Sequence, residues 1–140
     1  ARLSATSAAL KFPWGDRFPP SGTVTNIGDQ SAQSLVGRTL ANYNDGYAVS
    51  APVASFPANS KGLYDMGGNV SEWMQDYYSI TSSFSKTTDV DPMGNDEGEF
   101  KTIRGASWRH GSIGETRLSF RQFGFAAAND IGFRIARYAE

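Results

Sequence analysis

The sequence predicts a β-dominated α+β domain with short irregular strands and long ordered loops. Three separated stretches, residues 69–77, 100–108 and 132–138, have the residue types that are typical of strands. Apolar residues at helical spacing are missing from the long stretch 21–51. The chain also contains 15 glycines and 6 prolines, which favour turns. We therefore expect loops that are shaped by side-chain hydrogen bonds and by ions.

The first part of the chain is predicted to consist mostly of turns and loops. Residues 1–10 are small and polar, which indicates a surface lead-in, and residues 12–16 (Phe-Pro-Trp-Gly-Asp) indicate a sharp turn with two aromatic side chains to bury. Residues 21–51 are rich in Asn, Gly, Ser and Thr, so we expect irregular structure with short strands. A loop-dominated stretch of this length normally has a function or an organiser such as a metal ion.

The second part contains the expected strands and one further loop. Two prolines in residues 51–57 predict an extended segment at a sheet edge. Residues 69–77 alternate as a strand does, and residues 79–99 are polar, acidic and rich in turn residues, which predicts an exposed loop. Residues 100–108 and 132–138 complete the set of predicted strands.

Length, charge and composition set further bounds. With 140 residues, one domain is expected that buries roughly two thirds of its unfolded surface. A formal net charge of −1 provides no overall field for nucleic acid or anionic lipid. No apolar run approaches the roughly 20 residues of a membrane span. The start at Ala1 looks abrupt, so we expect a piece of a longer protein. The chain has no cysteine, which excludes disulfides and zinc–thiolate sites within it and leaves the compartment open.

The most informative stretch is residues 62–73, Gly-Leu-Tyr-Asp-Met-Gly-Gly-Asn-Val-Ser-Glu-Trp. Gly67 and Gly68 permit backbone conformations that expose carbonyl oxygens, and Asp65 and Glu72 add carboxylates on either side of the bend. Oxygen donors that are gathered by a tight glycine turn suit a hard cation such as calcium. The stretch therefore predicts a metal-organised bend that leads into a buried strand.

Four motifs, taken in their order along the chain, resemble the formylglycine-generating enzyme (sulfatase-modifying factor) family. They are the turn at residues 12–16, the signature at residues 59–73, Arg-Gly-Ala-Ser-Trp at 104–108 and Gly-Phe-Arg at 132–134. The resemblance runs from about Phe12 to the end, and most of the family's N-terminal part is missing. It implies a single formylglycine-generating-enzyme-like domain over residues 1–140, with a C-type-lectin-like α+β fold.

The resemblance also implies two structural calcium sites that are saturated by protein oxygens. The first would use the side chains of Asn26 and Asp45 and the carbonyls of Ile27 and Tyr47. The second would use the side chains of Asp65 and Glu72 and the carbonyls of Gly68 and Val70. Two alternatives stay open, because Asp45 also fits an Asx turn in Asn-Asp-Gly. Glu72 also fits a strand carboxylate that faces solvent or pairs with an arginine.

The chemistry of the family's oxidases is missing. Members that make formylglycine use a cysteine pair that binds copper, and soft thiolates are what Cu(I) prefers. In this chain the corresponding loop places His110 and Glu115 roughly where those ligands would be, so we expect neither copper nor oxidase activity. A Ser112–His110 nucleophile pair would lack an orienting group. The simpler interpretation is that His110 is an exposed or hydrogen-bonded loop residue.

Arginines and aromatic residues are interleaved between residues 104 and 137, which is typical of a recognition surface. The residues expected to contact a ligand are Trp108, Arg109, His110, Glu115, Arg117, Gln122, Phe123 and Phe125. Of these, Arg109, His110, Glu115, Gln122 and Phe123 are expected to lie on loop tips. Arg104, Arg121 and Arg134 lie in strand-like motifs, where pairing with carboxylates or loop carbonyls is the favoured role. The acidic residues of 89–99 offset the basic surface and argue against nucleic acid.

Three functions follow as hypotheses. The first is a calcium-stabilised, lectin-like binding or display domain that presents the loop 108–130 to a protein, peptide or glycan, as related variable proteins of diversity-generating retroelements do. The alternative is a cysteine-independent oxidative tailoring enzyme, similar to a pyoverdine-tailoring periplasmic relative, with Tyr77 and Tyr78 either as phenols for catalysis or as packing residues. The third is a structural or sensor domain of a larger bacterial protein. The resemblance favours the bacterial periplasm or cell surface, with the cytoplasm as the alternative.

Overall fold

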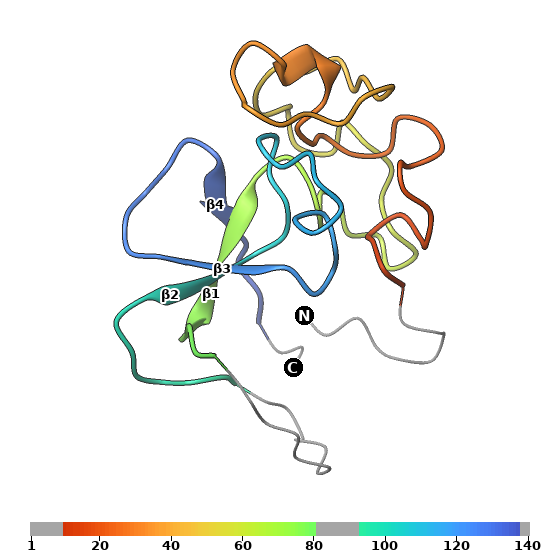
Figure 1. Cartoon of the computed structure of the whole chain (residues 1–140). Coiled ribbons are helices and arrows are strands. Elements are labelled where there is room, and N and C mark those ends of the chain that lie inside the picture. Colours follow the sequence, from red (N-terminus) through yellow and green to blue (C-terminus); the bar gives the residue numbers. More distant parts are fainter. Residues whose placement is uncertain (1–9, 81–92, 138–140) are drawn as a thin grey trace.

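The computed structural model describes residues 10–80 and 93–137. Its centre is one four-stranded sheet of β1 (Ser71–Tyr77), β2 (Lys101–Arg104), β3 (Arg121–Gly124) and β4 (Ile131–Phe133) in the order β3-β2-β1-β4 (Figure 1). β2 is antiparallel to both β1 and β3, whereas β4 is parallel to β1. A 3-10 helix, η1 (Gln30–Ala32), is the one helix in the described part of the chain. The predicted α+β class with short irregular strands is confirmed.

Two predicted strands are shorter in the structure than the sequence indicated. β2 ends at Arg104 because Gly105 has φ = 79°, a left-handed conformation that turns the chain out of the sheet. The strand predicted over residues 132–138 covers only Ile131–Phe133, and residues 134–137 form no regular element. Residue 138 lies outside the described residues. The strand predicted over 69–77 is observed from Ser71 to Tyr77 and is half-buried rather than fully buried.

β3 lies inside the stretch that was predicted to be a loop. Its sequence, Arg-Gln-Phe-Gly, is too short and too polar to show alternation on its own. The strand forms because residues 121–124 pair in register with all four residues of β2, with Ile103 opposite Gln122. The pairing with β2 therefore defines a strand that the local sequence does not.

Residues 10–60 are irregular apart from η1, as predicted for residues 21–51, and they gather on one side of the sheet (Figure 1). Their small core contains Ile27, Leu40 and Tyr43. The predicted turn at residues 12–16 is confirmed, since Phe12 is 3% exposed and stacks on Trp14 with ring centroids 5.3 Å apart. The extended segment predicted at a sheet edge over residues 51–57 does not join the sheet, and its chain turns at residues 53–54. Within the predicted loop 79–99, residues 93–99 are exposed, and residues 81–92 lie outside the described residues.

Buried hydrogen bonds hold these loops to the sheet, with Asn69 at their centre. The Asn69 backbone N–H donates to the Asn26 carbonyl at 2.7 Å, and its carbonyl accepts from the Trp108 N–H at 2.9 Å. Its side-chain amide pairs with both backbone groups of Ala51 at 2.8 and 3.1 Å. Through its backbone and its side chain together, this one buried residue links its own segment to three others that are far away in sequence. Gly68 is required beside it, because a Cβ there would lie 1.9 Å from the Thr25 hydroxyl oxygen.

Candidate calcium sites and binding surface

The first predicted calcium site gathers buried side-chain oxygens from two loops. Asn26 is fully buried, and its amide donates to the Val49 carbonyl at 2.8 Å, which leaves its Oδ1 without a donor among the described residues. The nearby carboxylate of Asp45 accepts from the backbone N–H groups of Ile27 at 3.0 Å and Tyr47 at 2.9 Å. The structure therefore brings together three of the four predicted residues through direct contacts and places Asn26 next to Ile27.

Asp29 provides a second carboxylate at this site that was not predicted from the sequence. Asp29 is fully buried, and its side chain accepts from the Ser31 N–H at 2.8 Å and from the Asp45 backbone N–H. In the sequence, Asp29 is distinguished only by its position three residues after Asn26. An Asp that merely belongs to a turn could occupy the same position. Burial raises the pKa of Asp45 to about 6. The negative charge of Asp29 adds to this effect, and the backbone N–H groups of Tyr47 and Ile27 oppose it.

This donor set fits a calcium ion. Two adjacent buried carboxylates and an unpaired amide oxygen make up an electron-rich cluster, and within the described residues no Lys or Arg forms a salt bridge with it. Buried charges are normally paired or coordinate a metal. Calcium takes carboxylate, amide and carbonyl oxygens of this kind.

The second predicted site already contains a cation from the protein. Both carboxylate oxygens of Glu72 accept from Arg134, with Oε1 at 3.0 Å from Nε and 2.6 Å from Nη2. The same Nη2 donates to the Tyr64 carbonyl at 2.9 Å, and the Glu72 hydrogen bonds raise the pKa of Arg134. The structural role expected for Arg134 is confirmed. Asp65 has φ = 55° and accepts from the Ala54 N–H at 2.9 Å. Calcium at this site, with the Gly68 and Val70 carbonyls, stays a prediction.

His110 is a hydrogen-bonded part of the loop base. The Ser107 backbone N–H donates to its Nδ1 at 3.0 Å, which assigns the ring proton to Nε2. The side-chain amide of Gln122 lies 3.3 Å from Nε2 and accepts this proton when its oxygen, rather than its nitrogen, is turned toward the ring. Burial lowers the pKa of His110. The Ser107 hydroxyl donates to the Asp130 carboxylate at 2.9 Å, and its oxygen also lies 3.1 Å from His110 Nδ1. His110 is therefore a neutral imidazole with a hydrogen-bond partner beside each of its ring nitrogens.

The neighbouring turn does not form a nucleophile pair. The Ser112 hydroxyl and its backbone N–H both donate to the Glu115 carboxylate, the latter at 3.1 Å. The Ser112 oxygen is therefore committed to a carboxylate instead of to His110. Glu115 closes its own turn and is half-buried, so it presents little of its charge to a ligand.

The predicted ligand residues near Trp108 divide into buried and exposed ones. Trp108 is 4% exposed, and its indole N–H has no acceptor among the described residues. The guanidinium of Arg109 lies 5.4 Å above the Trp108 ring and donates to Asn129 at 3.3 Å. Trp108 thus supports Arg109, which is exposed, as is Arg117.

Further along the chain, Phe123 and Phe125 belong to an exposed aromatic cluster. The expectation that Gln122 and Phe123 lie on loop tips is wrong, because both are on β3. Phe123 is 55% exposed and its ring centroid lies 5.1 Å from those of Tyr78 and Phe100. Phe125 is 83% exposed and contacts Phe100 at 5.9 Å.

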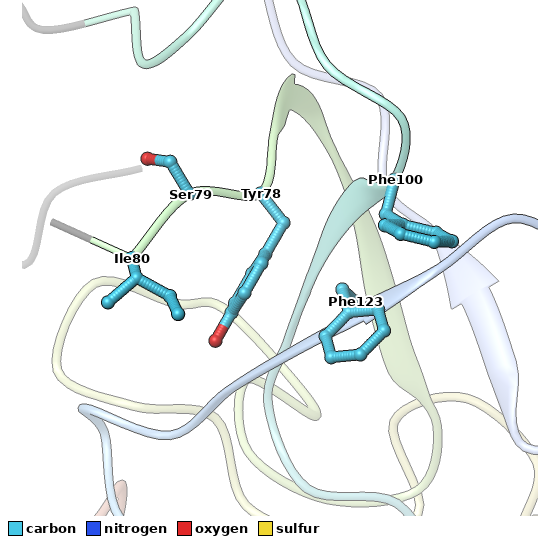
Figure 2. A pocket seen from close by; sticks show the side chains of 5 residues that line it. All are labelled: Tyr78, Ser79, Ile80, Phe100 and Phe123. Carbon is cyan, nitrogen blue, oxygen red and sulfur yellow. The ribbon is translucent and has the colours of Figure 1, made fainter.

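A cavity of about 300 Å³ opens in this cluster, as Figure 2 shows, where the Tyr78 ring stands between Ile80 and Phe123. The lining residues are Tyr78, Ser79, Ile80, Phe100 and Phe123. Tyr78, Ile80 and Phe100 were not predicted as ligand residues, because only the pairing of β1, β2 and β3 brings them to Phe123.

The fold and these sites define a domain of the formylglycine-generating-enzyme type. The family profile described as "Sulfatase-modifying factor enzyme 1-like domain" matches residues 1–139, and the chain belongs to this family. The formylglycine-generating enzyme of Streptomyces coelicolor is 31% identical over 137 residues, which cover 95% of this chain and 42% of that enzyme. The serine/threonine-protein kinase Pkn1 of Chlamydia trachomatis is 43% identical over 61 residues, 43% of this chain and 10% of the kinase.

Solved structures show the same architecture. PvdO from Pseudomonas aeruginosa superposes with a TM-score of 0.60 at 26% identity, covering 92% of this chain and 45% of PvdO. Treponema denticola variable protein 1 superposes with a TM-score of 0.57 at 24% identity, covering 82% of this chain and 40% of that protein, and shows the shared fold. The chain thus spans less than half the length of these relatives. None of its described helices is long and apolar enough to cross a membrane.

Proposed function

We propose that the chain is a calcium-stabilised binding or display domain that presents residues 108–130 and has no formylglycine-generating oxidase activity. The observation that carries this proposal is the separation of two sets of side chains. Buried polar residues such as Asn69 hold the frame together, whereas Arg109, Arg117 and Phe125 project from it. A rigid frame with side chains that are exposed, rather than buried in its core, suits recognition.

Calcium would complete the frame. Asn26 and Asp45, with carbonyls from residues 27 and 47, would hold the ion, and Asp29 would position Asp45 through its backbone N–H. The ion would neutralise two buried carboxylates and fasten residues 26–29 to residues 45–47. Because protein oxygens would fill its coordination shell, it would serve structure and provide no open position for chemistry.

The composition of the loop after Trp108 supports the absence of oxidase activity. The chain contains no cysteine, so no thiolate pair is available for copper. His110 and Glu115 do not replace that pair, because both are hydrogen-bonded within their own loop.

A tolerance experiment tests the display role. The triple variant Arg109→Ser, Arg117→Ser and Phe125→Ser should melt at the wild-type temperature, since these side chains are exposed. Asn69→Ala should lose about 2–4 kcal/mol, because it removes two buried hydrogen bonds and places Ala at φ = 69°. A triple variant as destabilised as Asn69→Ala would contradict the proposal.

A second experiment tests the chemistry. The purified chain, supplied with copper and a cysteine-bearing sulfatase peptide, should consume no oxygen above the peptide-free rate. Oxygen uptake with conversion of the peptide cysteine would overturn the proposal.

The alternative function, a cysteine-independent oxidative enzyme, is favoured by one observation. The Tyr78 phenol lies in an open cavity beneath the guanidinium of Arg121, 5.2 Å from the ring centroid, where a substrate could reach it. Stoichiometric copper or iron after aerobic purification, measured together with oxygen consumption, would support this alternative. Tyr77 is the weaker candidate for a phenol in catalysis, because the Lys101 ammonium covers its ring at 3.5 Å from the centroid.

The domain is also proposed to be part of a larger protein. Its match to 10% of a kinase and to 42% of an enzyme supports this view. The sequence of the full-length gene tests it directly, and an open reading frame limited to these residues would contradict it.

A further inference from the structure

The aromatic cavity on the β3 side of the sheet has a cationic rim. Arg121 and Phe123 are alternate residues of β3 and therefore share one face of the sheet. The Arg121 guanidinium lies over the Tyr78 ring, which lines the cavity, at 5.2 Å from its centroid. Among the described residues no hydrogen-bond acceptor pairs with this guanidinium. Its donors are thus available beside an apolar cavity.

A second arginine lies directly opposite. Arg104 of β2 pairs in register with Arg121, and like charges at such positions destabilise a sheet. Burial, followed by the charge of Arg121, lowers the pKa of Arg104. Asp76 offsets this charge in part, but its carboxylate also accepts from the Thr102 hydroxyl at 3.0 Å. Arg104 itself donates to the Leu118 carbonyl at 2.7 Å, so Arg121 is the arginine with free donors. Glu72 of β1 is in register with Arg104 on its other side, but both of its oxygens accept from Arg134. The free donors of Arg121 therefore favour an additional anion.

The apolar part of the site fits a ring. The ring of Phe123 is tilted by 42° to that of Tyr78 and by 52° to that of Phe100, and the three rings line a cavity of about 300 Å³. Tilted rings are a favourable geometry for contact with a further aromatic group. Ile80, 89% exposed, adds an aliphatic wall. A ring in this cavity and a carboxylate on Arg121 would be neighbouring parts of one ligand.

We propose that this site binds an aromatic carboxylate, with the ring against Phe123 and Tyr78 and the carboxylate on Arg121. The proposal rests on the binding function proposed above and names the chemical class of its ligand. The ligand would then contact mainly the exposed side of β3 rather than the loop 108–120. Tyr78, Ile80 and Phe100, which lie outside residues 108–130, would contribute to this contact.

The test uses three small probes on the full chain in calcium, followed by amide chemical shifts. N-acetyl-phenylalanine has both ring and carboxylate, N-acetyl-phenylalaninamide has the ring alone, and N-acetylglycine has the carboxylate alone. For a ligand of this size we expect a dissociation constant on the order of 1 mM for the first probe. The amide should bind about tenfold more weakly, and N-acetylglycine weaker still. Shifts should centre on residues 78, 100 and 121–124.

Matched variants separate the two parts of the site. Arg121→Gln should bring the carboxylate probe down to the affinity of its amide and leave the amide unchanged, and Arg121→Lys should restore part of the difference. Phe123→Ser should abolish binding of both ring-bearing probes. Arg38→Gln and Phe133→Ser are the controls, because Arg38 is exposed and Phe133, 75% exposed, lies on β4 at the opposite edge of the sheet.

Three outcomes would overturn the inference. They are equal binding of acid and amide, binding that survives Phe123→Ser, and no binding at millimolar concentration. Self-association that disappears in Phe123→Ser, seen by sedimentation velocity without probe, would assign the surface to a second copy and would overturn it as well. None of these results affects loop tolerance, so the display proposal would stand. Oxygen consumption would instead overturn that proposal whether or not the probes bind.

Discussion

Arg134 forms a forked ion pair with Glu72 across the parallel strands β1 and β4, with Nη2 at 2.6 Å from Oε1. Glu72 lies on β1, and Arg134 directly follows the last residue of β4. The same guanidinium also reaches the Tyr64 carbonyl, so one side chain joins the end of β4 to the signature turn. β4 is a strand of only three residues, and this pair supplies an attachment that its short ladder lacks.

Arg134→Lys tests this attachment. Lysine keeps the charge but cannot form the fork, so we expect a loss of about 1–2 kcal/mol in the free energy of unfolding, measured with urea. The side chains of Arg134 and Glu72 are 34% and 15% exposed, which places the pair between surface and buried cases. Arg38→Lys, at an exposed position, is the control. Equal stability of the two variants would show that the fork contributes nothing.

Calcium should stabilise the protein through Asp45. At about 100 times the dissociation constant, binding adds about 2.7 kcal/mol, or roughly 10 °C in melting temperature for a domain of this size. Asp45→Asn should remove that response. In chelator it should melt below the wild type, because Asn can accept only one of the two backbone N–H bonds from Ile27 and Tyr47. The readout is therefore the calcium-induced shift of each variant relative to its own chelated state.

Asp96→Asn serves as the control for this experiment, since Asp96 is an exposed carboxylate outside the cluster, and it should keep the full calcium response. A wild-type melting temperature that chelator leaves unchanged would refute the calcium proposal at this site.

The single histidine of the chain should titrate below its ordinary pKa of about 6.5. Burial disfavours the imidazolium in the folded state, so the folded protein binds fewer protons than the unfolded one. His110 therefore contributes stability above pH 6.5 that is lost as the pH falls from 6.5 through the folded pKa. The Cε1 proton shift gives this pKa without ambiguity, and urea-unfolded chain provides the reference. A folded value at or above the reference would contradict the buried, neutral imidazole.

Gly68 should be intolerant of a side chain. A Cβ there would lie 1.9 Å from the Thr25 hydroxyl oxygen and 2.7 Å from the Asn26 carbonyl oxygen, and the latter is fixed by its bond to Asn69. We expect Gly68→Ala to cost at least about 3 kcal/mol or to prevent folding. Gly37→Ala is the matched control, because nothing lies within 4 Å of its Cβ position, and it should change stability by less than about 1 kcal/mol. Circular dichroism melts of both variants decide the matter.

Sequence patterns alone predicted much of this protein. The signature at residues 59–73, with its glycines and amide, identified the family and the tight turn, because a chain can approach another backbone this closely only where Cβ is missing. The strand β1 followed from alternation, and the lack of cysteine removed thiolate chemistry directly from the composition.

Tertiary structure decided the features that depend on pairing between distant residues. β3 exists only by its register with β2, and that register alone sets Arg121 opposite Arg104 and Phe123 beside Tyr78. Asp29 likewise becomes a partner of Asp45 only when a loop of 16 residues closes on itself. Local composition determines which conformations a segment can adopt. The neighbours of a charged or aromatic side chain are determined instead by how the segments pack, and both proposed binding sites depend on that packing.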